Sequence, residues 1–242
     1  NNMSLFQFFL IIVAFNSLSH FILLFFSVNQ KSPKLFLRLF FLPVLLSTWF
    51  SLTLQQINEV AYLSNRQILG NLLLSAWVLK SFYLDKPLKL ALLSDFLNKF
   101  KNAVINNKYK RILSMIFYVS ILQIICFSSV VSLNFLSGPS SFYWMDYISL
   151  IICIFGMFYY LKSNSQSELE QSYLLEGLAE LATHPQYLGN LIFFFGIFLL
   201  STGATGGVWS FIGSLTIIFL MHRVVIPENT KRASSREVIH NQ

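Results

Sequence analysis

Charged residues are scarce in this sequence, and their scarcity excludes a large class of proteins. Only 11% of the 242 residues are charged, whereas 55% are hydrophobic and 17% are aromatic. A soluble domain has to cover its core with a polar surface and carries about 25% charged residues on average. The sequence therefore predicts an integral membrane protein that crosses the bilayer several times.

Cysteines and acidic residues are also few. The two cysteines, Cys126 and Cys153, fall within apolar runs and show no pairing or metal-ligand spacing, so we expect neither a disulfide framework nor a metal site. Lys and Arg number 17 against 10 Asp and Glu, which gives a net charge of +7. Because the basic residues lie between apolar runs, we expect them to face anionic membrane lipid and not nucleic acid.

Long apolar runs make up most of the chain and predict an all-α bundle of seven transmembrane helices, the last two forming a helical hairpin. No repeat or linker divides the chain, so we expect one membrane domain over residues 1–242. The first run is expected to be retained, because basic residues follow it where a signal peptide has small ones. The runs cover roughly residues 5–28, 39–54, 67–84, 112–136, 143–161, 188–203 and 207–222.

The basic residues also predict the orientation of these helices. If successive loops alternate between the two sides of the membrane, 16 of the 17 Lys and Arg fall on one side, here called the basic side, and only Arg66 falls on the other. Positive charge collects on the cytoplasmic or matrix side of a membrane. We therefore expect the C-terminal end of the chain on that side and the N-terminal end on the opposite one.

One loop on the basic side shows helical periodicity. Leu92, Phe96 and Phe100 recur at helical spacing over residues 88–105, with lysines and asparagines between them. This pattern is typical of an amphipathic helix that lies along the membrane surface.

A polar stretch, residues 183–190, precedes the sixth apolar run and carries the signals of a helix start. Thr183 is a suitable N-cap, Pro185 suits the first turn, and Gln186 stands in capping-box spacing from Thr183. The unpaired N–H groups of such a helix start are able to hold the phosphate or carboxylate of a cofactor. An ordinary helix start explains the same residues.

Two glycines on the predicted sixth helix lie seven residues apart. Gly189 and Gly196 therefore share one face of the helix. A face without side-chain volume admits either a closely packed neighbouring helix or a flat cofactor. The sequence leaves both alternatives open.

The stretch Thr183-His184-Pro185-Gln186-Tyr187-Leu188-Gly189-Asn190 resembles the Arg-His-Pro-Asn-Tyr-Phe-Gly-Glu motif of the steroid 5α-reductase C-terminal family and of the related isoprenylcysteine and phospholipid methyltransferases. Further fragments follow the family's order, and the similarity covers roughly residues 67–232. An early Trp-x-x-Arg-x-x-x-Leu region of the family is similar to Trp77-Val78-Leu79-Lys80-Ser81-Phe82-Tyr83-Leu84. The later fragments are Ser163-Asn164-Ser165-Gln166, Gly177-Leu178 and Pro227-Glu228.

Three departures from the family pattern each remove charge. Thr183 stands in place of an arginine, Asn190 replaces a glutamate, and a serine or asparagine replaces the aspartate before Gln166. A hydroxyl does not bind an anion as a guanidinium does, and an amide does not accept a proton as a carboxylate does. The resemblance therefore implies the fold together with an eroded site that holds no cofactor. We expect an accessory or structural subunit of a larger membrane complex, surrounded by lipids and other membrane subunits.

The resemblance also implies two enzymatic alternatives. An active NADPH-dependent reductase of a lipid or sterol double bond would use Tyr187 as proton donor, with His184 and Glu228 completing the catalytic group. Its cofactor would be held by residues of the polar stretch and of the fragment before it, namely Gln166, Thr183, His184, Gln186, Gly189 and Asn190.

A methyltransferase acting on a lipid or on a prenylated thiol would bind S-adenosylmethionine at the same helix start. These enzymes carry tandem acidic residues after the final span, whereas Glu228 stands alone here. For every alternative we expect a multi-pass protein of the endoplasmic reticulum or the mitochondrial inner membrane.

Overall fold

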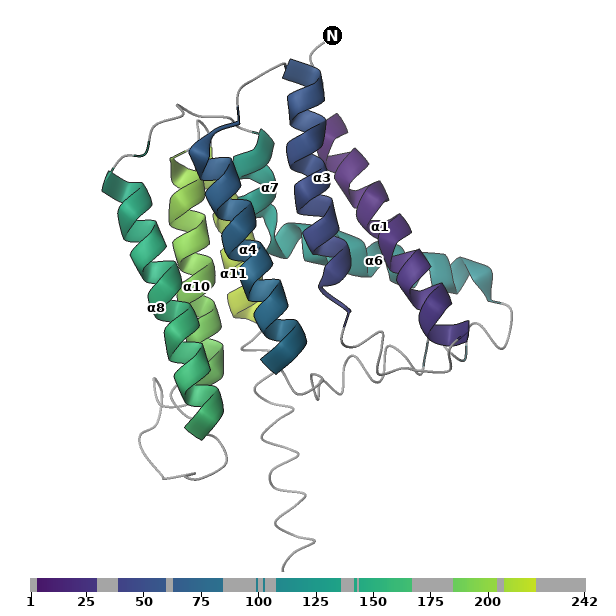
Figure 1. The fold of residues 1–242 in the computed structure, drawn as a ribbon. Coiled ribbons are helices and arrows are strands. Elements are labelled where there is room, and N and C mark those ends of the chain that lie inside the picture. Colours follow the sequence, from purple (N-terminus) through teal and green to yellow (C-terminus); the bar gives the residue numbers. More distant parts are fainter. Residues whose placement is uncertain are drawn as a thin grey trace, which may run out of the picture.

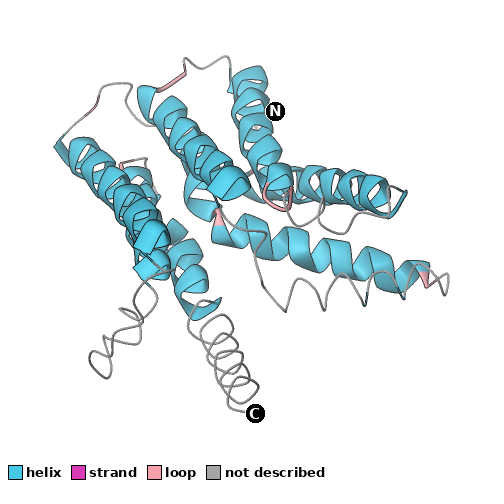
Figure 2. Cartoon of the chain, turned by 60° about the horizontal axis from the view of Figure 1, so that its bottom comes forward, coloured by secondary structure: helices cyan, strands magenta, loops and turns pink. Residues whose placement is uncertain are grey.

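A computed structural model of the protein describes residues 4–29, 39–59, 63–84, 99, 102, 108–135, 142, 144–166, 185–203 and 207–220. Within these residues every regular element is a helix, as Figures 1 and 2 show. The elements are α1 (Leu5–Asn29), α3 (Leu42–Glu59), α4 (Asn65–Leu84), α6 (Tyr109–Cys126), α7 (Ser128–Phe135), α8 (Trp144–Gln166), α10 (Pro185–Thr202), the 3₁₀ helix η1 (Gly207–Ser210) and α11 (Phe211–Leu220).

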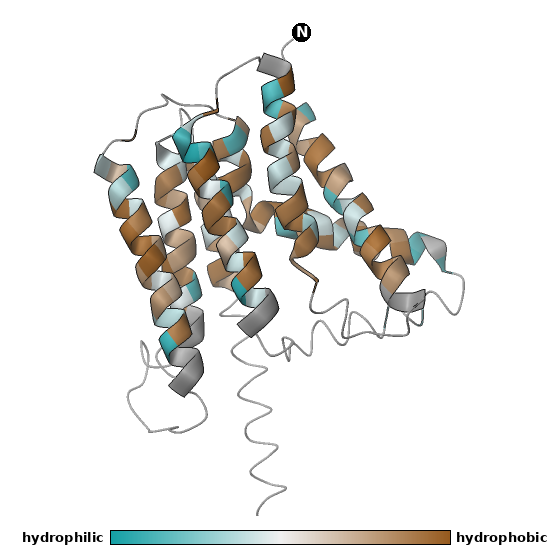
Figure 3. Cartoon of the chain, viewed as in Figure 1, coloured by the Kyte–Doolittle hydropathy of each residue, from teal (hydrophilic) through white to brown (hydrophobic). Residues whose placement is uncertain are grey.

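Each of the seven predicted apolar runs coincides with a helix or with a pair of consecutive helices, which confirms the all-helical class. Hydrophobic residues, coloured brown, recur along these helices in Figure 3. Among the described residues, Phe6–Phe26 of α1 and Trp144–Lys162 of α8 are long and apolar enough to cross a membrane, and α6 with α7 makes a third span if the bent pair is one. The other four spans remain a prediction.

The fourth predicted run is not straight. Helices α6 and α7 meet at Phe127 with a bend of 70°, so that α6 lies across the other helices in Figure 1. The run contains no proline or glycine from which a break in the helix could be predicted. The bend has a tertiary partner in Gly213 of α11, where a Cβ atom would lie 2.7 Å from the carbonyl oxygen of Ile125 and 2.9 Å from that of Cys126. The backbone of α11 thus packs directly into the bend.

A buried polar network joins α3, α4 and α7. Asn134 donates hydrogen bonds from Nδ2 to the carbonyl oxygen of Thr48 at 2.8 Å and to Oγ of Ser51 at 2.7 Å. Its side-chain oxygen accepts a bond from Asn71 at 2.7 Å, and its backbone oxygen accepts one from Gln67 at 2.9 Å. Polar groups in an apolar interior need such partners, so this network specifies how the three helices pack.

The isolated basic residue of the sequence, Arg66, is buried at the start of α4. Its Nε atom lies 2.7 and 2.9 Å from the two carboxylate oxygens of Asp146 at the start of α8, and Nη1 donates to the carbonyl oxygen of Gly203 at 3.1 Å. Both ionic side chains are almost fully buried. The ion pair joins α4, α8 and the residue that follows α10, and it gives the positive charge of Arg66 a buried partner.

The surface helix predicted over residues 88–105 lies almost entirely outside the described residues. Two of its residues, Lys99 and Asn102, are described, and both are helical and exposed. The amphipathic helix therefore remains a prediction.

Candidate functional site

The predicted site residues divide into three groups by what the structure describes. Gly189 and Asn190 are described in full, in the first two turns of α10, and the helix begins at Pro185, within the polar stretch where the sequence predicts a helix start. The backbone places Gln166 at the end of α8 and Gln186 and Tyr187 at the start of α10, while their side chains lie outside the description. Thr183, His184 and Glu228 lie outside the described residues.

Asn190 is in contact with the early fragment of the family resemblance. Its side-chain oxygen accepts a hydrogen bond of 3.0 Å from the indole Nε1 of Trp77 and one of 3.1 Å from Nζ of Lys80. Trp77 and Lys80 are three residues apart and therefore share one face of α4. The structure thus joins two fragments that are 110 residues apart in the sequence.

Lys80 carries a buried charge at this junction, with only 7% of its surface exposed. Its Nζ atom lies 3.1 Å from the ring centroid of Tyr160 on α8 and 5.4 Å from that of Trp77. Aromatic faces attract cations, and the attraction grows when water is excluded. Helices α4, α8 and α10 therefore meet around one ammonium group, and we call Trp77, Lys80, Tyr160 and Asn190 the Lys80 junction.

The indole of Trp77 is held by apolar rings on its other sides. Its ring centroid lies 4.9 Å from that of Phe41, 5.0 Å from that of Phe194 and 5.7 Å from that of Phe127. Edge and tilted contacts of this kind favour one ring orientation. The three rings therefore hold the indole in the orientation in which its N–H donates to Asn190.

The glycine face of α10 is occupied by α8. A Cβ atom on Gly189 would lie 2.7 Å from the backbone nitrogen of Tyr160, and one on Gly156 would lie 2.5 Å from that of Phe193. One on Gly196 would lie 2.5 Å from Sγ of Cys153. Of the two alternatives for this face, the structure shows the close helix neighbour, because backbone meets backbone where a flat cofactor would need room.

The junction contains one residue that the sequence reasoning missed and two that only the resemblance singled out. Tyr160 lies in an apolar run rich in aromatic residues, where nothing distinguishes it from a lipid-facing ring. Trp77 and Lys80 were named only as a fragment similar to the family. Their pairing with Asn190 was not foreseen, although a lysine inside an apolar helix needs a polar or aromatic partner.

The Lys80 junction supports only a few kinds of chemistry. The ammonium of Lys80 is able to attract an anion, and the start of α10 adds N–H groups at the same end of the bundle. The Asn190 amide is neutral and does not exchange a proton at ordinary pH. Among the described residues, no group of three or more His, Cys, Asp or Glu side chains comes together in a way that would hold a metal ion.

Comparison with known proteins assigns the chain to a family. The family described as "Protein of unknown function (DUF1295)" matches residues 94–238, which is more than half of the chain and includes α10. The protein therefore belongs to the DUF1295 family. No curated protein and no solved structure matches the chain.

Proposed function

We propose that this DUF1295 protein has the steroid 5α-reductase-like fold and serves as an accessory, non-catalytic subunit of a larger membrane assembly. The observation that carries the proposal is the bonding of Asn190, whose side-chain oxygen accepts hydrogen bonds from both Trp77 and Lys80. The side chain of this motif residue thus joins α10 to α4.

The substitution pattern supports this proposal. Positions 80 and 190 correspond, by resemblance, to an arginine and a glutamate, and the structure has lysine and asparagine in contact there. Where the family motif has two charged residues, this chain thus has a cation and an amide, and their hydrogen bond joins α4 to α10. Selection for a helix junction tolerates this replacement, whereas selection for proton transfer does not.

The outer surface of α8 supports membership of an assembly. Tyr147, Ile151, Phe155 and Phe158 recur at helical spacing and are each more than half exposed. A surface of this kind is suited to lipid and to the helices of neighbouring subunits. We assign the assembly to the endoplasmic reticulum or the mitochondrial inner membrane, with the basic loops on the cytoplasmic or matrix side.

A second candidate function rests on Lys80 itself. A buried cation beside the start of α10 is a feature that a reductase would use to hold the phosphates of NADPH. In that case Tyr187 donates the proton and His184, Gln166 and Gln186 position the cofactor. The carboxylate of S-adenosylmethionine would bind in the same place in a methyltransferase.

Calorimetric titration of the purified protein in detergent micelles tests the proposal. NADPH and S-adenosylmethionine are titrated separately into the wild-type protein and into Lys80→Met, which removes the charge but keeps most of the volume. We expect no binding by either protein. Micromolar binding to the wild type, about −8 kcal/mol, that is lost in Lys80→Met would overturn the accessory role and identify the cofactor.

A further inference from the structure

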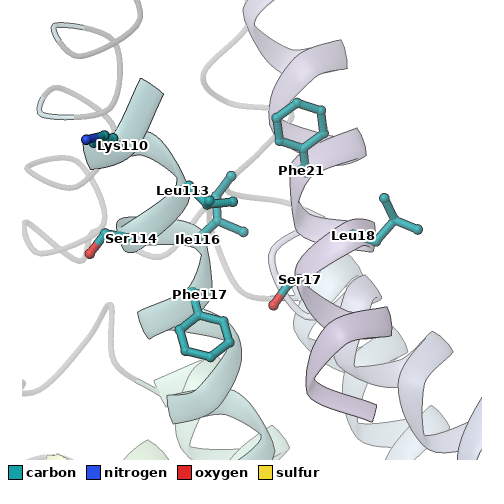
Figure 4. Close-up of a pocket in the computed structure, with 8 residues that line it drawn as sticks. All are labelled: Ser17, Leu18, Phe21, Lys110, Leu113, Ser114, Ile116 and Phe117. Carbon is teal, nitrogen blue, oxygen red and sulfur yellow. The ribbon is translucent and has the colours of Figure 1, made fainter. Parts of the chain in front are cut away.

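An open groove of about 760 Å³ is lined by residues of α1 and α6 and by none of the residues of the Lys80 junction (Figure 4). Leu18 and Phe21 line it from α1, and Leu113 and Phe117 line it from α6. These four side chains are about half exposed or more. From Lys110 to Phe117 the α6 wall extends for roughly 10 Å along the helix axis, so the groove is long enough to receive part of a hydrocarbon chain.

The groove has a basic end. Lys110 lies among its lining residues at the start of α6, as Figure 4 shows, and Lys108 and Arg111 stand on either side of it in the sequence. All three basic residues are exposed. The first turn of α6 contains no acidic residue, and Lys108 at the N-cap makes no side-chain capping bond.

This charge arrangement is unfavourable for α6 taken alone. The N-terminus of a helix carries a partial positive charge, so cationic side chains there repel the helix dipole. An anion bound beside Lys110 at this helix start offsets the repulsion and forms charge-assisted hydrogen bonds. Because the α6 start lies on the predicted basic side of the membrane, lipid phosphates are the anions nearest to it.

We propose that the groove is a binding site for one anionic phospholipid. One acyl chain lies between α1 and α6 against Leu18, Phe21 and Phe117, and the phosphate is bound by Lys110 with Lys108 and Arg111. The inference is independent of the function proposed above, since it concerns a different surface and would hold for an accessory subunit and for an enzyme. The basic residues favour an anionic lipid over a zwitterionic one, because in the zwitterionic headgroup a cationic amine offsets the charge of the phosphate.

Native mass spectrometry of the protein in a non-ionic detergent tests this site. Phosphatidylglycerol and phosphatidylcholine with the same two oleoyl chains are added separately, and the fraction of protein that retains one lipid is measured. We expect phosphatidylglycerol to be retained about tenfold more strongly than phosphatidylcholine, as expected for headgroup charges near several basic side chains. Equal retention of the two lipids would overturn the proposal.

Two matched pairs of variants locate the lipid. Lys110→Glu should lose the preference for phosphatidylglycerol, and Lys99→Glu, the same change at an exposed lysine outside the groove, should keep it. Ser114→Phe fills the groove and should lower retention, whereas Ser114→Ala leaves it open and should not. Ser114 and Lys110 are exposed, so these variants should fold, and Lys110→Gln provides a milder charge change.

A short-chain lipid separates the contribution of the acyl chain from that of the headgroup. Dihexanoyl phosphatidylglycerol has the same headgroup and should be retained at least tenfold less than the dioleoyl lipid, because little apolar surface is buried. Equal retention of the two would show that only the phosphate binds, and equal losses in Lys110→Glu and Lys99→Glu would show general surface attraction. Either result contradicts the proposed site.

Discussion

Helix α4 carries a buried cation near each of its ends, and the two cations are stabilised by different partners. Arg66 donates hydrogen bonds to both carboxylate oxygens of Asp146 and to the backbone carbonyl oxygen of Gly203. Lys80 faces the amide of Asn190 and the rings of Tyr160 and Trp77. Among the described residues, an ion pair thus joins the helices near one end of α4, and near the other end an amide and two aromatic rings surround the cation.

The difference shows what each end contributes. Removing one member of a buried ion pair leaves an uncompensated charge, so the Arg66 end depends strongly on a single residue. Cation–π contacts and amide hydrogen bonds are each weaker and more numerous, so the Lys80 end depends on several residues at once. The motif of the family resemblance lies at the second end, where a change of residue is more easily tolerated.

The largest effect is expected at the ion pair. Asp146→Ala leaves Arg66 charged and buried and should lower the free energy of unfolding by about 3–5 kcal/mol. Denaturant unfolding in mixed micelles, followed by circular dichroism, measures this. The double variant Arg66→Met/Asp146→Leu serves as control and should recover most of the loss. A small loss in Asp146→Ala would contradict a structural ion pair.

A smaller loss is expected at the contact of α8 with α10. Gly189→Ala places a methyl group against the backbone of Tyr160 and should cost about 1–3 kcal/mol. Gly70→Ala is the matched control, because its Cβ atom would meet the side-chain Cδ2 of Leu133 at 2.6 Å, and a side chain can rotate away. The same unfolding measurement should show a larger loss of stability in Gly189→Ala than in Gly70→Ala. Equal losses in the two variants would argue against backbone contact at Gly189.

The smallest effect is expected at the Lys80 junction. Asn190→Ala removes two hydrogen-bond acceptor contacts and should cost about 1–2 kcal/mol. Asn190→Asp keeps the acceptor, adds a charge opposite Lys80 and should be at least as stable as the wild type. Thermal unfolding of the three proteins side by side checks both. A destabilised Asn190→Asp would show that Lys80 is already balanced by another anion.

The positions of the helices could be predicted from the sequence because hydropathy is a local property. A helix start in the polar stretch is predicted from its local residues, among them a proline suited to the first turn, and α10 begins at Pro185. The bend at Phe127 could not be predicted, since its partner Gly213 lies on another helix and the bent run itself contains no breaker. Hydropathy also shows only that a helix is apolar, so it does not separate a spanning helix from a buried one.

The contacts of the candidate site were only partly accessible from the sequence. Arg66 and Asp146 are 80 residues apart, and no spacing rule connects them. A general rule favours the pair, because a buried ionisable residue of a membrane helix needs a partner, and an opposite charge at the start of another helix is a suitable one. The sequence gives a weaker indication of the contact between Lys80 and Asn190. Both residues lie in fragments that resemble the same family, but the resemblance does not say that the two fragments touch.

A double-mutant cycle at the Lys80 junction tests the central claim that the motif region is a structural helix junction. The unfolding of the wild type, Lys80→Met, Asn190→Leu and the double variant is measured with and without NADPH. A structural junction predicts a coupling of about 1 kcal/mol or more between the two sites and no change with NADPH. The opposite result has two parts. The losses of stability in the two single variants add within about 0.5 kcal/mol, and NADPH raises the unfolding midpoint of the wild type but not that of Lys80→Met. This result would contradict the account.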